Sequence, residues 1–436
     1  MRSKLRSAFY FSRLSLAWFF AAVLASCGQW QPPLDAMESG GFARAHRPNQ
    51  SAQNYTLLYF FSSKGGSYPD SQLAYVDGRL YGTTYEGGAY GGGTIFALDS
   101  DGKMRIVHSF QRGADGFGPG AGVTEFNGKL FGTTIHGGKG HDAHRHSDGV
   151  AFSISTSGSN YRVIHRFLGG QDGAFPSRSA MIVSNGRLYG TTEGYSSSTS
   201  QCAFSEFGCG TVYEITPPGK LRTIYSFDGG RDGYAPMGVV ALRGVLYGTT
   251  EFGGKHECPY EVGCGTIFSV TVSGTKRGLY SFNGKYGYWP KAGLAVLDGA
   301  LYGDTSRGGI SRSCIYYVSR GCGTVFGITT SGKFRVLYRF KGDRDGATPV
   351  AALLAVKGAL YGTTQYGPAD SGSPKGEGTV FSVSTGGHQV MLHEFEGPPK
   401  DGEDPEGALI TVAGRLYGTT YGGGPSERGT VFSIAP

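Results

Sequence analysis

Short runs of apolar and β-branched residues, separated by glycine-bearing turns, cover the chain from about residue 55 to its end. Runs of this length without a 3.6-residue period predict β-strands. In residues 352–395 four such runs follow one another, and Lys357-Gly358 and Gly386-Gly387 join them in pairs as tight hairpin turns. We therefore predict a unit of four antiparallel strands, termed A, B, C and D in chain order: Ala352–Val356, Ala359–Thr364, Thr379–Val383 and Gln389–Phe395.

This unit recurs seven times along the chain. Strand B carries Leu-Tyr-Gly-Thr-Thr or a close variant, strand C lies in Gly-Thr-Val-Phe or a variant, and strand D ends in Phe. The motif glycines span 336 residues over six intervals, a mean period of 56. Repeated four-stranded units of this period predict an all-β protein, a seven-bladed β-propeller of antiparallel blades. The motif glycines are Gly82, Gly132, Gly190, Gly248, Gly303, Gly362 and Gly418.

The two ends of the repeat region are complementary. The run Tyr55–Phe61 reads as a strand D without a unit of its own, and the last unit stops after its strand C, Thr430–Ile434. Pairing these two strands closes the ring and removes an edge that would otherwise template aggregation. We therefore assign residues 54–436 to a propeller closed by its N-terminal strand.

The repeats Gly-x-Leu-Tyr-Gly-Thr-Thr-x-x-Gly-Gly and Gly-Thr-Val-Phe-Ser-Ile resemble the choice-of-anchor tandem repeats known as GloVer (Gloeo-Verruco) repeats. The resemblance covers about Tyr55 to Pro436. It implies export, a propeller-like fold and an anchor that varies between members. It implies no activity.

The N-terminus predicts export and lipid anchoring. Basic residues up to Arg13 precede an apolar run, Leu14–Leu24, that is too short to span a bilayer but suits a signal peptide. Leu24-Ala-Ser-Cys27 resembles the lipobox of bacterial lipoproteins, and ordinary cleavage after Ala25 is the alternative. We predict a signal peptide over 1–26, lipidation of Cys27 and a flexible tether over 27–53. Gly28 after the lipidated residue resembles an outer-membrane or cell-surface address.

Seven cysteines support this interpretation, because lipidation of Cys27 uses the odd one and leaves three close pairs. In an oxidising compartment such pairs form disulfides, whereas a zinc site needs four ligands close together. Each pair lies in a B–C loop, where a bridge restrains the loop. The predicted bridges are Cys202–Cys209, Cys258–Cys264 and Cys314–Cys322.

Composition excludes several classes of protein. The 76 glycines argue against a helical fold, and 57 aromatic residues (27 Tyr, 27 Phe and 3 Trp) argue against disorder. After Cys27, 36 basic residues face 33 acidic ones, so the formal charge falls from +7 to +3. Nucleic acid is therefore not an expected partner, and membrane contact is expected through the lipid alone.

Residues present in every unit are most simply packing or turn devices. The motif tyrosines are expected to pack between blades, and Asp in the Gly-x-Asp-Gly-x-x-Pro linkers to form Asx turns rather than calcium sites. Small residues at the start of strand A predict a narrow central channel, so we expect no buried cofactor.

Function is therefore sought where the units differ, on the face that carries the B–C and D–A connections. Carboxylates follow or replace part of the strand B motif in three adjacent units, as Glu193, Glu251 and Asp304. Tyr288 and Trp289 lie in a D–A linker on the same face. We predict that these five residues bind a ligand, and the three acids are weak catalytic candidates because glycoside hydrolysis uses paired carboxylates.

One B–C loop is rich in histidine, with His136, His141, His144 and His146 beside Asp142 and Asp148. Histidine with carboxylate suits Zn or Cu, but a polar glycine-flanked loop is also typical of a solvated segment. These histidines are therefore weak metal candidates, and no metal site is predicted.

The leading hypothesis is a monomeric, lipid-anchored extracytoplasmic propeller that binds a glycan or an envelope protein. No nucleophile elbow, Walker loop or zinc-protease motif is present, so whether the protein is an enzyme stays open. A carbohydrate-active hydrolase or lyase using the loop-face carboxylates is the alternative. A purely structural spacer is a third possibility.

Overall fold

The computed structural model describes residues 54–138, 148–194, 208–255, 258, 262–309, 314, 321–342, 345–367 and 376–436. Every described residue belongs to one compact unit, 40–436. The predicted signal peptide, the lipidated Cys27 and the tether all lie outside the described residues. They therefore remain predictions.

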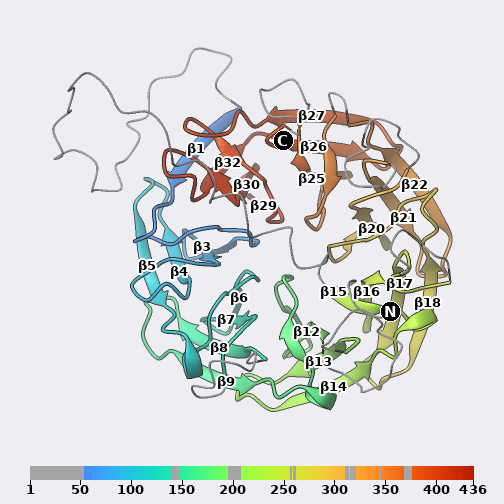
Figure 1. The fold of residues 1–436 in the computed structure, drawn as a ribbon, viewed down its shortest axis with the longest axis horizontal. Coiled ribbons are helices and arrows are strands. Elements are labelled where there is room, and N and C mark those ends of the chain that lie inside the picture. Colours follow the sequence, from blue (N-terminus) through green and yellow to red (C-terminus); the bar gives the residue numbers. More distant parts are fainter. Residues whose placement is uncertain are drawn as a thin grey trace, which may run out of the picture. The chain divides into compact units, whose positions relative to one another are not determined.

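The described residues form seven antiparallel sheets of four or five strands around a common axis (Figure 1). Blade one contains β2 (Ala74–Val76), β3 (Arg79–Thr84), β4 (Thr94–Leu98) and β5 (Met104–Ser109), and blade two contains β6 (Thr124–Phe126), β7 (Lys129–Thr134), β8 (Val150–Ser155) and β9 (Arg162–Arg166). Blade three contains β10 (Ala174–Pro176), β11 (Ile182–Ser184), β12 (Arg187–Gly194), β13 (Thr211–Ile215) and β14 (Leu221–Ser226). Blade four contains β15 (Tyr234–Leu242), β16 (Val245–Phe252), β17 (Thr266–Thr271) and β18 (Lys276–Ser281).

Blade five contains β19 (Ala295–Leu297), β20 (Ala300–Thr305), β21 (Thr324–Ile328) and β22 (Phe334–Arg339). Blade six contains β23 (Ala347–Pro349), β24 (Leu354–Val356), β25 (Ala359–Tyr366), β26 (Thr379–Ser384) and β27 (Gln389–Glu394). Blade seven contains β29 (Ile410–Val412), β30 (Arg415–Thr420), β32 (Thr430–Ile434) and β1 (Tyr55–Phe60), and a small ladder joins β28 (Gly402–Glu403) to β31 (Gly422–Gly423). The predicted seven-bladed fold is confirmed. Among the described residues, the helical segments are three 3₁₀ turns in D–A linkers, η2 (Gly113–Asp115), η3 (Gly170–Asp172) and η4 (Gly230–Asp232), and none has the length or apolarity of a membrane span.

The predicted closure of the ring is also confirmed. Strand β1 pairs antiparallel with β32, from Tyr55 opposite Ile434 to Phe60 opposite Thr430. The Tyr55 ring stacks on His393 of blade six at 3.6 Å between centroids, and its hydroxyl donates to Asp401 over 2.6 Å. The N-terminal strand thus completes the last blade and also contacts the one before it.

A glycine opposite an aromatic residue builds the core of each blade. The motif glycine Gly82 lies directly across from Phe96, and a Cβ on Gly82 would come within 2.5 Å of that ring. The same cross-strand pair recurs in the other blades, for example as Gly303 opposite Phe326. Because glycine has no side chain, the ring can lie over the neighbouring strand and become fully buried. This pairing explains why the two motifs occur together in every repeat.

The other repeated residues are structural as well. Tyr81 of blade one packs in a cluster with Leu130 and Phe152 of blade two, which is the expected inter-blade contact. In the linkers, Asp115 accepts from the Gln111 main-chain N–H over 2.9 Å and lies 3.1 Å from His108 Nε2. These contacts fasten the linker to its own strand D. They are not the expected Asx turn, because the Phe117 N–H that such a turn would use donates to the His136 carbonyl over 2.9 Å. No cluster of metal-ligating side chains occurs among the described residues.

The starts of the A strands approach one another closely around the axis. A Cβ on Gly122 would lie 2.1 Å from the Gln72 carbonyl oxygen of blade one, and a Cβ on Gly238 would lie 2.6 Å from Ser179 Oγ of blade three. Small residues are therefore required here. This close approach agrees with the narrow channel expected from the sequence.

Candidate functional site

The D–A linkers cross from one blade to the next on the loop face, and their backbone has an unusual conformation. The residue before the linker proline has a positive φ in every blade, although it is glycine in blade two alone. Its N–H donates to the preceding blade, as from Trp289 to the Cys264 carbonyl over 3.0 Å. A left-handed conformation costs a non-glycine residue roughly 1–2 kcal/mol, so these contacts must hold the linkers in place. The residues are Tyr68, Gly118, Phe175, Ala235, Trp289, Thr348 and Asp404.

Polar side chains that follow these linkers, or that follow the strand B motif, interact around the axis. We call this group the axial cluster: Asp70, Tyr85, Arg178, Glu193, Glu251, Lys291, Gln365 and Glu406. They come from every blade except blade two. The cluster therefore depends on closure of the whole ring.

Arg178 of blade three connects the cluster across the axis. Its Nη1 donates to Asp70 Oδ2 of blade one over 2.6 Å, and its guanidinium lies 5.4 Å from the Tyr85 ring centroid. Its charge also interacts with the carboxyl groups of Glu193 and of Glu406 in blade seven. Asp70 is 1 % exposed and Arg178 is 35 % exposed. The guanidinium is thus held by a buried acid but remains accessible from the loop face.

Glu193 and Glu251, at equivalent positions of blades three and four, have different electrostatic environments. Burial above all, together with the neighbouring Glu251 carboxylate, raises the pKa of Glu193 to about 7 against the opposing effects of Arg178 and Lys291. Glu251 lies 3.6 Å from Lys291 Nζ and is 15 % exposed. Glu193 is therefore half-protonated near neutral pH, beside a carboxylate that is paired with a cation.

Asp304 does not join this pair. It lies within β20, is 3 % exposed, and neither carboxyl oxygen has a hydrogen-bond partner among the residues that the structure describes. Burial raises its pKa. Of the three acids singled out by the sequence, the structure brings two together.

Tyr288 and Trp289 are mainly packing residues in this structure. Tyr288 is 2 % exposed, and Trp289 Nε1 donates to the Gly263 carbonyl over 3.2 Å. The indole also packs edge-on against Phe252, with 5.9 Å between ring centroids. These contacts fix the linker just before Lys291 and so position that residue beside Glu251.

Two of the three predicted disulfides are present, Cys258–Cys264 and Cys314–Cys322. Cys209 is also disulfide-bonded, and its predicted partner Cys202 lies outside the described residues. The Cys314 sulfur packs against the next D–A linker, since a Cβ on Gly342 would lie 2.4 Å from it. Disulfides are typical of oxidising compartments, which supports an extracytoplasmic location.

The histidine-rich loop can be described only in part. His136 lies 5.1 Å from the Phe117 ring and 5.8 Å from the Phe175 ring, between centroids. His141, His144 and His146 lie outside the described residues. The suggested metal site therefore stays untested.

Sequence reasoning missed most of the axial cluster. Its unrecognised members include Asp70, Lys291 and Glu406, each of which directly follows a linker proline. The equivalent residues in the other blades are uncharged. A comparison of this position among repeats would have found the three charges, just as the position after the strand B motif revealed Glu193 and Glu251.

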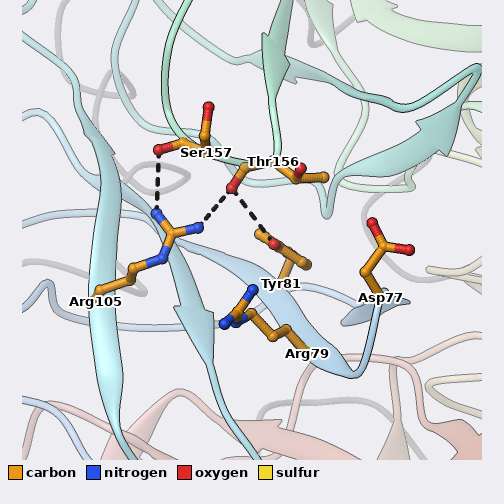
Figure 2. Close-up of a pocket in the computed structure, with 6 residues that line it drawn as sticks. All are labelled: Asp77, Arg79, Tyr81, Arg105, Thr156 and Ser157. Atoms are coloured by element: carbon orange, nitrogen blue, oxygen red, sulfur yellow. Dashed lines mark hydrogen bonds between the residues drawn. The ribbon is translucent and has the colours of Figure 1, made fainter.

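An open pocket of about 430 Å³ lies on the opposite face, between the hairpin turns of blades one and two (Figure 2). Arg105 donates to the Thr156 carbonyl over 2.6 Å and to the Ser157 carbonyl over 3.3 Å. The same arginine-to-turn contact recurs between later blades, from Arg222 to Val272 and from Arg277 to Ser331. The polar groups of this pocket thus belong to the scaffold.

Comparison with known proteins identifies the repeat and the fold. A model of the Gloeobacter/Verrucomicrobia repeat matches residues 46–204, 194–370 and 315–436. An oligogalacturonate lyase in complex with manganese is similar in structure, with 12 % identity, 88 % of this chain and 94 % of that chain covered, and a TM-score of 0.50. Also similar is an oligogalacturonate lyase from Vibrio parahaemolyticus, with 11 % identity, 88 % of this chain and 93 % of that chain covered, and a TM-score of 0.49. A gluconolactonase from Xanthomonas campestris has 13 % identity, with 88 % of this chain and 92 % of that chain covered, and a TM-score of 0.42. At these identities the likeness shows the propeller fold alone, and no curated protein sequence matches the chain.

Proposed function

Because the chain belongs to the Gloeobacter/Verrucomicrobia repeat family, whose repeated residues here build the scaffold, we propose that its function resides in the residues that differ between repeats. The proposed function is that of an extracytoplasmic binding module, anchored through a lipid on Cys27, that binds a glycan at the axial cluster. The convergence of the axial cluster on one face is the observation that carries this proposal.

The chemistry of the cluster suits a polyhydroxylated ligand. Carboxylate and amide oxygens accept hydrogen bonds from sugar hydroxyls, and guanidinium and ammonium groups donate them. Tyr85 adds an aromatic face with a polar end. Gln365 Nε2 donates to Glu406 Oε1 over 2.9 Å, which orients both groups before a ligand arrives. Preorganised polar groups of this kind lower the entropic cost of binding.

The scaffold does not require these side chains. The position of Glu193 and Glu251 is occupied by Ile135 in blade two and by Ser306 in blade five, yet those blades have the same strands. A group that is dispensable for the fold and is partly buried among charges is typical of a functional site. This argument favours a ligand site over a purely structural spacer.

The proposal predicts that Glu193→Gln or Glu251→Gln weakens glycan binding about 10- to 100-fold, since loss of a hydrogen bond to a charged group costs roughly 1.5–3 kcal/mol. The measurement is a glycan-array screen of the mature chain, followed by calorimetric titration of the best ligand. Glu403→Gln is the matched control, because burial and Glu377 raise the pKa of Glu403 to about 7, and none of the groups that shift this pKa belongs to the axial cluster. Failure of every glycan to bind, or capture of an envelope protein instead, contradicts the glycan assignment.

A second candidate function, a carbohydrate-active hydrolase, is favoured by the contrast between Glu193 and Glu251. A carboxyl group whose pKa is raised to about 7, beside a carboxyl group that is paired with a lysine, is the arrangement of an acid and a base. In this reaction Glu193 would protonate the glycosidic oxygen as its bond to the anomeric carbon breaks. Glu251 would take a proton from the water that attacks that carbon.

The hydrolase hypothesis predicts release of reducing ends from the bound glycan, with an activity that falls as the pH rises above about 7 and Glu193 loses its proton. Glu193→Gln should lower kcat at least 100-fold, because general acid catalysis typically contributes 10²- to 10⁴-fold. If a tightly bound glycan is recovered intact after long incubation, the hydrolase hypothesis is wrong and the protein is a binding module.

A further inference from the structure

At three seams in the described part of the chain, the first threonine of the strand B motif joins adjacent blades in one way. Thr83 Oγ1 donates to the Ala121 carbonyl of the next blade over 3.0 Å, and Thr249 Oγ1 donates to the Ala292 carbonyl over 2.7 Å. The last blade contacts the first in the same way, from Thr419 Oγ1 to the Ser71 carbonyl over 3.2 Å. At each of these seams a side-chain hydroxyl supplies the donor that a buried main-chain carbonyl needs. In blade six Thr363 Oγ1 donates instead to the Pro405 carbonyl over 3.1 Å, and in blade three Thr191 Oγ1 donates to Ser177 Oγ over 2.8 Å.

Blade five has Asp304 at this position. Asp304 lies opposite Val325 as Thr249 lies opposite Ile267, so the two side chains occupy the same place in their blades. A carboxylate only accepts hydrogen bonds and cannot replace the threonine donor, whereas a neutral carboxyl group has one O–H to donate. No donor among the described residues reaches either oxygen of Asp304.

Within the described part of the chain, we find no charged group that compensates Asp304. Strands β19, β21 and β23, which contact β20, have no titratable side chain, and neither has β24 beyond β19. Tyr302 is the other titratable residue of β20 itself. In the adjoining linkers, Lys291 is paired with Glu251, and the Arg307 guanidinium donates to Thr348 Oγ1. A carboxylate buried without a partner is expensive, so the surroundings favour the neutral acid.

We propose that a proton on Asp304 closes the seam between blades five and six. The neutral carboxyl group donates its O–H to the main-chain carbonyl of Ala351, the residue equivalent to Ala121 and Ala292 in their linkers. When the proton leaves to solvent, two acceptors face each other and the seam opens. Blade five, on one side of this seam, carries the Cys314–Cys322 disulfide in its B–C loop. Proton loss therefore loosens the loop face beside blade five.

The sign of the pH effect follows from linkage. Burial raises the pKa of Asp304 in the folded chain, whereas the unfolded chain releases this proton near pH 3.9. Above that pH the folded state holds one proton more than the unfolded state. The stability of the folded state therefore falls as the pH rises, until the folded-state pKa is reached.

The test compares the full chain with Asp304→Thr, which restores the hydroxyl found in the other six blades. Chemical unfolding is measured from pH 4 to pH 8. We expect the ratio of the unfolding equilibrium constants, full chain over variant, to rise with pH above about pH 4, approaching tenfold per pH unit, and to level off once the folded-state pKa is reached. Glu193 and Glu403 change stability with the same sign, but they are present in both proteins and cancel in the ratio. A ratio that stays constant with pH overturns the proposal.

Hydrogen exchange locates the effect. After correction for the intrinsic pH dependence of exchange, amides of β20, β23 and β24 should exchange faster with rising pH in the full chain but not in Asp304→Thr. Amides of β3, at a seam that has Thr83, should show no difference between the two proteins. Thr249→Asp, which introduces a carboxyl group at the seam between blades four and five, should make that seam pH-dependent as well. The proposal is also overturned if, in the full chain, amides of β20 and β3 show the same change in exchange with pH. It is likewise overturned if Asp304→Thr is less stable than the full chain at pH 7.

Discussion

A chain that begins at Ser62, after β1, is expected not to form a stable monomeric propeller. Without β1, strand β32 becomes a free edge, and the fully buried Val431 and Phe432 lose their cover on one side. Five paired residues and the Tyr55 contacts disappear together. At about 1 kcal/mol for each hydrogen bond, this loss is a large part of the 5–15 kcal/mol that stabilises a typical domain. Size-exclusion chromatography and thermal unfolding should show aggregation or a loss of the cooperative transition.

The matched control is a chain that begins at Asn54, which lacks the N-terminal residues but keeps β1. It should unfold at the same temperature as the mature protein. A peptide of residues 54–61 added to the truncated chain should partly restore the transition, because the missing strand can pair from outside. A monomeric chain from Ser62 with unchanged unfolding would show that closure by β1 contributes little to stability.

Gly303→Ala is expected to lower the free energy of unfolding by about 3 kcal/mol, the upper end of the usual cost of overpacking. The new methyl group would lie 2.7 Å from Phe326 Cζ and 2.9 Å from Leu294 Cδ2, in a core with no space for it. Urea unfolding measures the difference. The same reasoning holds for the motif glycine of each blade, so the effect should not depend on the function of blade five.

Gly278→Ala is the control for this substitution. Gly278 lies in an exposed position of β18, and a Cβ there would have nothing within 4 Å, so its stability should change by less than about 0.5 kcal/mol. Replacing the opposing ring by a smaller side chain, in the double variant Gly303→Ala with Phe326→Leu, should recover part of the lost stability. Equal effects of Gly303→Ala and Gly278→Ala would refute the proposed role of the glycine–phenylalanine pair.

The sequence alone was sufficient for the architecture. Strand positions, the number of blades and the pairing of Tyr55–Phe61 with the last blade all follow from a local pattern that repeats seven times. A repeated pattern averages out the ambiguity of any single short strand. The disulfides Cys258–Cys264 and Cys314–Cys322 were also predictable, since each closes a short loop between neighbouring residues.

The site was predictable only in part. Glu193 and Glu251 stand out because they depart from the repeat at a position whose direction is set by the alternation of a strand. Arg178 did not stand out, because its contacts with Asp70 and Tyr85 depend on how a long side chain crosses the axis. Tyr288 and Trp289 were expected at a ligand surface, but their rings are largely occupied in packing.

Asp304 shows most clearly what the sequence alone could not predict. The sequence placed it beside Glu193 and Glu251, because all three lie near the ends of neighbouring strands. Only the packed structure shows that it lies buried within a seam, where none of the described residues donates a hydrogen bond to it. Local periodicity determines which face of a strand a residue occupies. Burial, charge pairing and the proton on a carboxyl group depend on groups tens to hundreds of residues away, and only the folded ring brings those together.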